Sequence, residues 1–177
     1  MKRIVGFWIL FAVTLAVYLT MILWSLRRIA ADADGLAPLD LRPGGYDLED
    51  ATAFLTALSD EGRAFYLGTQ HALDAVYPAL LALTLASAIF LLAPKRLGWV
   101  RHVLPLAALP LMIFDYLENA AVTALLKTPV DALTPELVET ASRWSVLKAQ
   151  ATTGAAILTL AMLIVWGVRR MRRRGNA

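Results

Sequence analysis

The sequence contains no cysteine and only two histidines in its 177 residues. The first absence excludes disulfide bonds, zinc–thiolate sites, iron–sulfur clusters and cysteine nucleophiles. His71 and His102 are predicted to lie near opposite membrane faces, which argues against a haem bound by both. The Glu-x-x-His pairs of a carboxylate-bridged di-metal site are also missing. We expect no cofactor and no metal, although the residues leave open a single ion held by His71, Asp74 and Glu118.

Charged residues are scarce as well, at 18% of the chain, whereas 59% of the residues are hydrophobic. This composition is too apolar for a soluble domain and indicates a membrane protein. The net charge of +3 does not indicate nucleic-acid binding, because the basic residues lie mostly at the ends of apolar segments. We therefore expect no nucleic-acid partner.

Four apolar stretches are long enough to cross a bilayer as helices, which requires about 20 residues each. They are residues 4–26, 68–93, 101–126 and 144–168. The predicted fold class is an all-α, four-span transmembrane helix bundle, with residues 1–177 forming a single integral membrane domain. The first stretch exceeds the roughly 7–15 apolar residues of a secretory signal, so we interpret it as a retained signal anchor.

The basic residues predict the orientation of these spans. Lys and Arg concentrate before the first span, between the second and third spans, and after the fourth, which assigns both termini to the cytoplasmic side. Arg27 and Arg28 lie in a segment that this assignment places outside, but the basic residues assigned to the cytoplasmic side outnumber them. The segments 27–67 and 127–143 then face outward. The composition, rich in Ala, Leu and Arg, suggests a bacterial inner membrane.

The first outer segment is predicted to contain a short amphipathic helix, at roughly residues 47–58. The turn sequence "RPGGY" precedes Asp47, which is a suitable N-cap residue. Leu48, Phe54 and Leu55 then fall on one helical face. Ser59 is the predicted N-cap of the next helix. This segment is either a structured connector or a lid over a site in the outer half of the bundle.

Polar residues interrupt the outer half of the second span at helical spacing. Tyr66, Gln70, Asp74 and Pro78 repeat every four residues along one face, and His71 lies close to that face. A proline inside a helix removes a backbone hydrogen bond, and freed carbonyl groups of this kind often line a cavity. The second span is therefore predicted to turn a polar face toward the bundle interior.

The third and fourth spans carry matching polar residues at the same depth. Asp115, Glu118 and Asn119 share a stripe of the third span, and Ser145 and Lys148 share a face of the fourth. An outer polar layer is therefore predicted, which comprises His71, Asp74, Asp115, Glu118, Asn119, Ser145 and Lys148, with Arg143 at its rim.

The cost of charge in a bilayer core, about 2.5–3.5 kcal/mol per residue, predicts that this layer faces inward and that its members pair. The inner halves of the spans are almost wholly apolar, which argues against a channel or a pump. Two interpretations stay open for the layer. It is a ligand or catalytic site, or it is a structural ion-pair network that joins the helices.

Two short motifs, "D-x-x-Y-P" within residues 68–93 and "D-x-x-E-N" within residues 101–126, resemble those of uncharacterised bacterial four-span proteins. The four-span outline is similar to that of membrane proteins of the EXPERA type, which include sterol isomerases and sterol-binding receptors. Those proteins place acidic residues in a pocket between helices and bind lipophilic ligands, often cationic ones. The resemblance implies a lipophilic ligand but assigns no role to any residue.

The leading hypothesis is a pocket in the outer half that binds a membrane lipid or a lipophilic small molecule, with or without acid–base processing. Asp115 and Glu118 are the candidates for proton exchange. The candidate ligand-binding residues are His71, Asp74, Asn119, Ser145, Lys148, Arg143, Tyr66 and Gln70. The alternative is a non-catalytic accessory subunit with partner membrane subunits. Whether the protein is an enzyme stays open from the sequence alone.

Overall fold

The computed structural model describes residues 2–175, with side chains as far as Arg172. All regular structure in this range is helical, and four helices are long and apolar enough to cross a membrane. They span Lys2–Ala31, Asp60–Leu92, Val100–Lys127 and Pro135–Arg172. The predicted all-α class is thereby confirmed, with four helices that could span a membrane, although each helix begins or ends beyond the predicted apolar stretch.

The first and second spanning helices each contain a π-helical turn. The first comprises α1 (Lys2–Thr20), the π turn η1 (Met21–Ser25) and α2 (Leu26–Ala31). The second comprises α4 (Asp60–Phe65), the π turn η3 (Tyr66–Gln70) and α5 (His71–Leu92). Ser59 caps α4 by accepting a hydrogen bond from the backbone nitrogen of Gly62 at 3.0 Å, as predicted.

The third spanning helix is interrupted near its start, whereas the fourth is continuous. The third comprises α6 (Val100–Val103), a 3₁₀ turn η5 (Leu104–Ala108) and α7 (Leu109–Lys127). Proline in the 3₁₀ turn removes a backbone donor there and explains the change of helix type. The fourth is α8 (Pro135–Gly175). Short 3₁₀ turns at Lys95–Leu97 and Val130–Ala132 lie in the last two connections.

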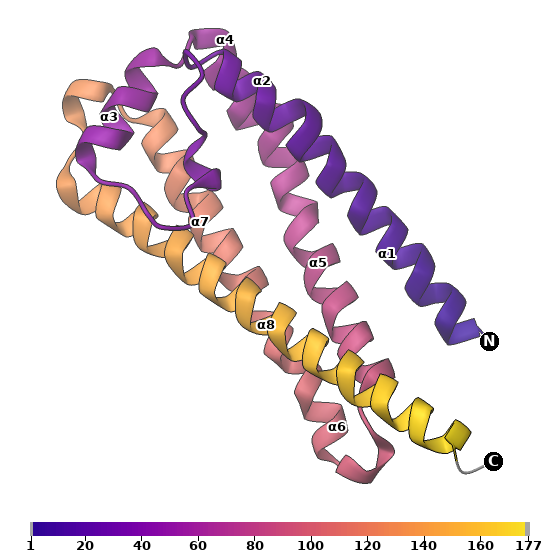
Figure 1. The fold of residues 1–177 in the computed structure, drawn as a ribbon. Coiled ribbons are helices and arrows are strands. Elements are labelled where there is room, and N and C mark those ends of the chain that lie inside the picture. Colours follow the sequence, from indigo (N-terminus) through magenta and orange to yellow (C-terminus); the bar gives the residue numbers. More distant parts are fainter. Residues whose placement is uncertain (1, 176–177) are drawn as a thin grey trace.

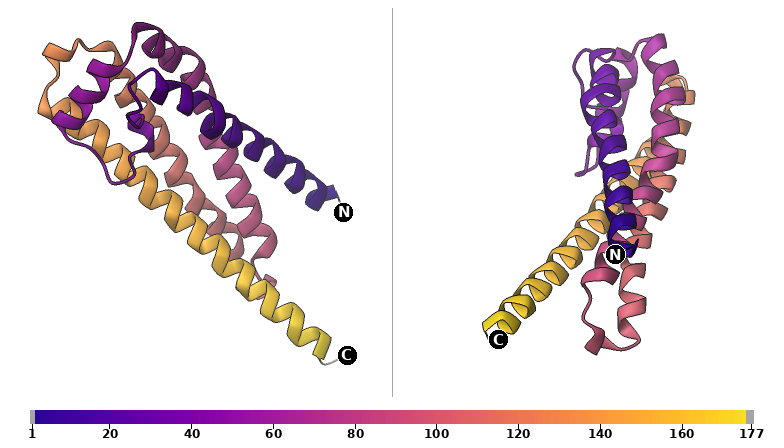
Figure 2. Two further views of the ribbon diagram at one scale, coloured as in Figure 1. Left: turned by 45° about the horizontal axis from the view of Figure 1, so that its top comes forward. Right: turned by 90° about the vertical axis from the view of Figure 1, so that its right-hand side faces the viewer.

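The four helices run antiparallel in sequence order, with α1 packed on α5, α5 on α7 and α7 on α8 (Figure 1). Both ends of the chain and α6 lie at one end of the bundle, while α3 and α4 lie at the other. The last turns of α8 diverge from the other helices (Figure 2). Ala82, Ala108 and Ala155 are buried where α5, η5 and α8 meet, and their small side chains allow close helix approach.

The segment between α2 and α5 folds back over one end of the bundle. It contains the connecting loop (residues 32–47) and α3 (Leu48–Ala57), whose N-cap Asp47 accepts a hydrogen bond from the backbone nitrogen of Asp50 at 2.9 Å. Leu39 and Phe54 are 0% exposed and form the centre of the larger hydrophobic core. The connecting loop therefore packs into the bundle and does not lie over it loosely.

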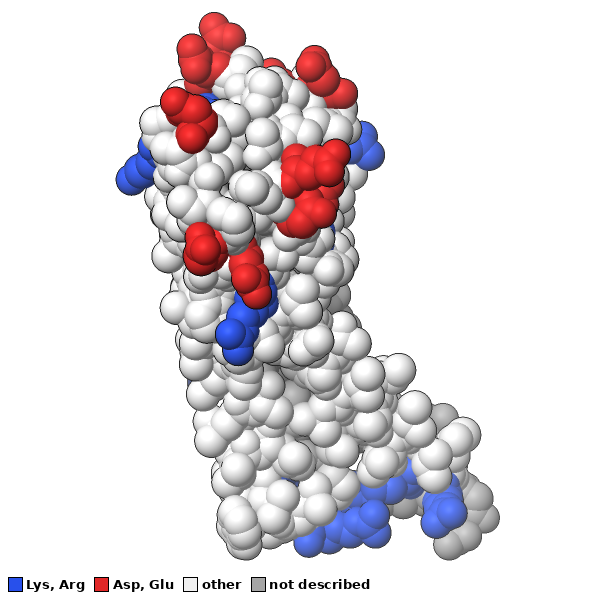
Figure 3. Space-filling view, turned by 90° about the vertical axis from the view of Figure 1, so that its left-hand side faces the viewer, with Lys and Arg blue, Asp and Glu red and all other residues white. Residues whose placement is uncertain are grey.

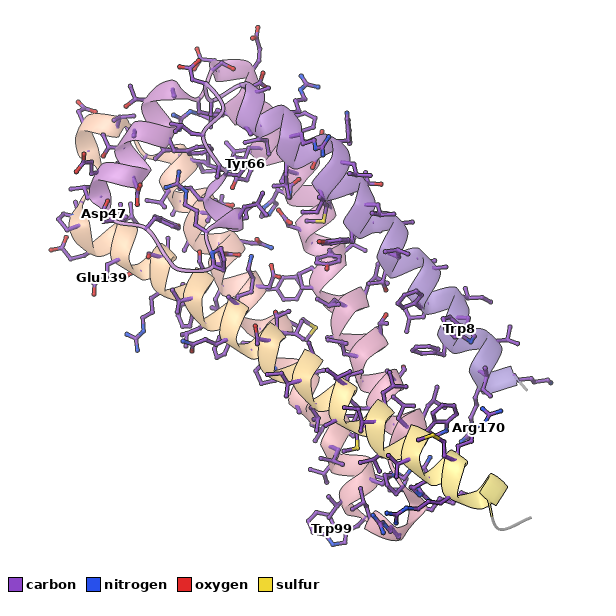
Figure 4. The ribbon with its side chains drawn as sticks, viewed as in Figure 1. Trp8, Asp47, Tyr66, Trp99, Glu139 and Arg170 are labelled. Carbon is purple, nitrogen blue, oxygen red and sulfur yellow. The ribbon has the colours of Figure 1, made fainter. Side chains whose placement is uncertain are left out.

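Charge is distributed unequally along the bundle axis. On the face shown in Figure 3, most acidic residues gather at the end that carries α3, and the opposite end is basic. The side chains of Asp47 and Glu139 lie at the first end, and those of Trp99 and Arg170 lie at the other (Figure 4). Between the two ends, the apolar stretch of α8 is only 6% buried. Such a surface is suited to contact with lipid.

Candidate functional site

An ion pair between Lys148 on α8 and Glu118 on α7 lies at the centre of the candidate site. Glu118 is fully buried, and the Lys148 side chain is 19% exposed. The Lys148 ammonium also lies 3.5 Å from the backbone oxygen of Asp40, in the connecting loop. The loop and two of the long apolar helices therefore meet at one ammonium group.

Asp40 extends the cluster into the connecting loop. Its Oδ1 accepts a hydrogen bond of 2.6 Å from the hydroxyl of Tyr66, which lies in the half of the bundle next to α3 (Figure 4). Its Oδ2 is buried and has no hydrogen-bond partner among the described residues. Burial raises the pKa of Asp40, and the positive charge of Lys148 opposes that rise.

A chain of hydrogen bonds joins the first helix to the second. Ser25 on η1 donates to Oε1 of Gln70 on η3, and the Gln70 amide nitrogen donates to both Asp74 carboxylate oxygens, at 3.0 and 2.9 Å. Asn119 on α7 then donates to the backbone oxygen of Asp74 at 3.2 Å. All four residues are at least nine-tenths buried. Asp74 is thus held from both neighbouring helices.

Tyr46 anchors the other end of the connecting loop on α8. Its backbone nitrogen donates to the Ser142 hydroxyl at 2.8 Å, and its side chain is 7% exposed. Ser145 lies beside both the Tyr46 hydroxyl and Glu118. Burial, reinforced by the charges of Glu118 and Asp40, raises the pKa of Tyr46, so the phenol stays neutral.

Two buried polar atoms near this anchor lack hydrogen bonds within the described part of the protein. They are Oε1 of Glu118 and the hydroxyl oxygen of Tyr46. Buried polar atoms are almost always satisfied, and leaving one unsatisfied costs about 1–3 kcal/mol. The hydroxyl of Ser145, which lies beside both residues, is the group placed to satisfy them.

The cluster holds more carboxyl groups than cations. Lys148 is the one cation that adjoins the buried carboxyl groups among the described residues; these groups belong to Asp40, Asp74, Asp115 and Glu118. Several like charges cannot all ionise cheaply at such short range in a low-dielectric interior. The arrangement therefore favours bound protons, a cationic ligand group or hydrogen-bond donors.

A pocket of about 100 Å³ opens beside these groups. Its lining is polar at Asp74, Asp115 and Lys148 and apolar at Met21 and Ile22 of the first long helix. A larger groove of about 280 Å³ lies at the other end of α1 and α5, far from the carboxyl groups. The pocket of about 100 Å³ is the candidate site, because it is lined by Lys148 together with Asp40, Asp74 and Asp115.

The structure brings together most of the residues that the sequence singled out. These are Tyr66, Gln70, Asp74, Asp115, Glu118, Asn119, Ser145 and Lys148. His71 instead is exposed, and its Nδ1 lies 3.5 Å from the Thr123 hydroxyl. Arg143 is also exposed and forms no ion pair within the described residues.

Three residues of the cluster were not predicted, namely Ser25, Asp40 and Tyr46. Asp40 and Tyr46 lie in the connecting loop, where no periodic pattern assigns a face. The one local signal is an acidic residue between two leucines in "PLDLRPGGY". Ser25 could have been paired with Gln70 only if the π turns had been anticipated.

No group of three or more His, Asp or Glu residues in the described part of the chain is arranged to bind a metal ion. His71, Asp74 and Glu118, which the sequence left open as ligands of a single ion, are therefore not grouped for metal binding in the described part of the chain. Comparison of the chain with protein families, with curated proteins and with solved structures finds no match. The geometry of the site must therefore carry the functional argument.

Proposed function

We propose that the protein binds a lipid-like molecule whose polar head enters the pocket between α1, α5, α7 and α8. The single observation that carries this proposal is the pocket's lining, which is apolar on the first helix and polar at Asp74, Asp115 and Lys148. A molecule that presents a polar head and an apolar flank satisfies both parts of the lining.

The size of the pocket restricts what enters it. Its volume of about 100 Å³ is well below the roughly 300–1,000 Å³ of sites that enclose drug-sized ligands. Only a small head therefore fits, and the chains stay in the bilayer along the exposed apolar side of α1. Because carboxyl groups exceed cations here, the head that binds best carries a positive charge or donates hydrogen bonds.

The same groups suit proton exchange with the head. Asp74 and Lys148 contact it from the polar part of the lining, and Asp115 lines the same pocket. Glu118 lies directly behind Lys148, to which it is paired. Asp115 or Glu118 then gives or takes a proton as the head binds, which is the acid–base step of an enzyme or the charge adjustment of a carrier.

The proposed setting is a bacterial inner membrane with both termini in the cytoplasm. Support comes from the basic end of the bundle, which includes Arg170, because positively charged segments are retained on the cytoplasmic side (Figures 3 and 4). In this orientation the acidic end faces the periplasm. There α3 and the connecting loop form an outer cover over the pocket.

An accessory role in a larger membrane complex is the second candidate. The observation in its favour is the low burial of the apolar stretch of α8, of which 6% is buried. A partner helix would cover that surface, although lipid would do so equally well. In this case the carboxylate cluster only holds the helices together.

Native mass spectrometry of the protein, extracted in a mild detergent, tests the proposal. We expect a bound molecule of lipid mass on the wild type and its loss from Ile22→Trp, which fills the apolar part of the pocket. Leu19→Trp is the matched control, because Leu19 is exposed on the same helix. A protein without bound lipid that retains a stoichiometric membrane subunit would support the accessory role instead.

A second measurement tests the chemistry of the head. A long-chain alkylamine and the alkyl phosphate of equal chain length are added separately to the purified protein. We expect the amine to raise the thermal unfolding temperature and the phosphate to leave it unchanged, and we expect the amine effect to be lost in Asp74→Asn combined with Asp115→Asn. Equal effects of both compounds would contradict a site that recognises the head.

A further inference from the structure

His71, Asn119 and Thr123 line two adjoining hollows on the side of the bundle where α5 meets α7. The outer hollow is an open groove of about 390 Å³, which also contacts Tyr116 and Ala120. The inner hollow measures about 10 Å³ and adds Asp40, Tyr66 and Asp74 to the shared residues. The groove therefore leads from the protein surface to two of the buried carboxyl groups.

Asp40 and Asp74 also line the proposed ligand pocket on the other side of the bundle. The two carboxyl groups thus stand between the inner hollow and the ligand pocket. Groove, inner hollow, carboxyl pair and pocket follow one another across the bundle. This succession gives the carboxyl groups a route to the surface that does not pass through the ligand pocket.

We infer that the groove between α5 and α7 admits water, and that one water molecule in the inner hollow transfers protons between His71 and the Asp40–Asp74 pair. The hollow's volume, about 10 Å³, lies at the lower limit for one water, about 10–15 Å³. A water there also needs two to four polar partners. Buried Oδ2 of Asp40, which has no partner among the described residues, supplies one of them.

The depth of the groove in the membrane favours the same assignment. The hydrogen bond between Ser25 and Gln70 holds the start of α5 level with the end of η1, next to Trp24. Trp24 is exposed, and tryptophan is enriched at the boundary between lipid and water. His71, the residue after Gln70, is exposed at this level. Water is available at this depth.

The charged and titratable groups around the inner hollow come from every element packed against it. They are Asp40 of the connecting loop, Tyr66 of η3, His71 and Asp74 of α5, Asp115 and Glu118 of α7, and Lys148 of α8. His71 alone among these is an exposed imidazole, a side chain whose two ring nitrogens can donate and accept a proton. It is therefore the group that exchanges protons with the surrounding water.

The protonated imidazole of His71 gives a proton to the water, and the water gives one of its own to the Asp74 carboxylate. His71 becomes neutral and Asp74 becomes a carboxylic acid, while the water is regenerated. His71 then takes up a proton from solvent at the groove. Thr123, whose hydroxyl lies 3.5 Å from Nδ1 of His71, positions the ring.

Infrared spectroscopy of the protein in lipid nanodiscs tests this path without any ligand. After transfer to heavy water, the signal of the protonated carboxyl groups shifts as they exchange their protons for deuterium. We expect His71→Phe to slow this shift by roughly tenfold or more, which corresponds to a barrier increase of about 1.4 kcal/mol. His102→Phe is the matched control, because His102 lies in α6 at the opposite end of the bundle. This variant should leave the exchange rate of the carboxyl groups unchanged.

A second pair of variants identifies the entrance. Ala120→Phe narrows the groove without altering a polar group, whereas Ile22→Trp narrows the ligand pocket. We expect Ala120→Phe to slow the hydrogen–deuterium exchange of the carboxyl groups and Ile22→Trp to leave its rate unchanged. These two variants also test the path if His71→Phe does not fold. The reverse result, or an unchanged rate in Ala120→Phe, would overturn the proposed path. Neither outcome bears on lipid binding, which the mass measurement tests separately.

Discussion

Ser25 on the first spanning helix donates a hydrogen bond to Gln70 on the second, and each residue is the last of a π-helical turn. The π turns are in contact, so the two irregular segments face each other at one level. π turns are rare and occur frequently at functional sites. Since Gln70 also donates to Asp74, a displacement of the first helix would be transmitted to a carboxylate of the pocket.

The first prediction concerns this contact. Ser25→Ala leaves Oε1 of Gln70 without its donor, so we expect the free energy of unfolding to fall by about 0.6–1.7 kcal/mol, the range for hydrogen bonds between membrane helices. Thr20→Ala is the control, because the Thr20 hydroxyl bonds only to its own helix and is exposed. Denaturation of both variants in the same detergent gives the comparison. Equal losses would show that the contact contributes nothing specific.

The Lys148–Glu118 pair gives a second prediction. Lys148→Met leaves the buried Glu118 carboxylate without its cation, and we expect a loss of about 3–5 kcal/mol in unfolding free energy. Adding Glu118→Gln removes the unpaired charge, so the double variant should recover most of that loss. The three proteins are compared by thermal unfolding in detergent. A double variant as unstable as Lys148→Met would mean that the ammonium stabilises something other than Glu118.

The helices and the inward direction of the polar residues could be predicted from the sequence. Tyr66, Gln70, Asp74 and Pro78 repeat every four residues, and all four are buried. The spacing of these residues fixes which side of the helix they share, and the cost of charge in lipid decides where that side points. Both arguments assume regular helical geometry, and the shared face is kept although Tyr66 and Gln70 lie at the two ends of a π turn.

The contribution of the connecting loop could not be predicted in the same way. Asp40 lies in a three-residue 3₁₀ turn (Leu39–Leu41) and Tyr46 lies outside any helix, so no helical repeat in the sequence assigns them a face, and their positions depend on how the loop closes. Arg42 helps to close it, since its side chain donates to the Ala37 oxygen at 3.1 Å and pairs with Asp50 at 3.2 Å. Such contacts become visible only after the loop has folded. The loop therefore supplied a carboxyl group that the hydropathy pattern had not indicated.

Gly45 gives a third prediction, about the fit of that loop on α8. Its φ of +84° disfavours other residues, and an added Cβ would lie 2.7 Å from the Ser142 hydroxyl oxygen. We expect Gly45→Ala to cost of the order of 1–3 kcal/mol and to speed hydrogen exchange in residues 36–47. Gly44→Ala is a matched control, because nothing lies within 4 Å of its added Cβ. If both variants exchange equally fast, the loop does not depend on this close approach.

The proposed orientation is tested with single cysteines, which the cysteine-free chain allows without background. We expect a cysteine at the exposed position 49 to react with a membrane-impermeant maleimide in intact cells after the outer membrane has been made permeable. A cysteine at position 172 should react only after the inner membrane is opened. Reaction of position 172 from outside would reverse the orientation and place the pocket in the cytoplasmic half.

The last prediction concerns pH and Asp40, which lies outside the spanning helices. Burial raises the pKa of its carboxyl group above the ordinary value of 3.8, so the folded protein holds this proton more tightly than the unfolded chain. The stabilisation is complete below that ordinary value and is lost as pH rises through the raised pKa. Asp40→Asn keeps an oxygen for Tyr66 but cannot ionise.

We therefore compare the unfolding free energy of Asp40→Asn with that of the wild type. The variant's value minus the wild type's should increase as pH rises from 3.8 through the raised pKa of Asp40. The increase is at most about 1.4 kcal/mol per pH unit, and the difference then levels off. Denaturant titrations of both proteins at matched pH values measure the difference, in which the other titrating groups largely cancel. Gly44→Ala is the control, since it alters the same loop without removing an ionisable group, and its difference should be flat. A difference for Asp40→Asn that decreases with pH would mean that attraction to Lys148 outweighs burial, and that the folded loop prefers the charged carboxylate.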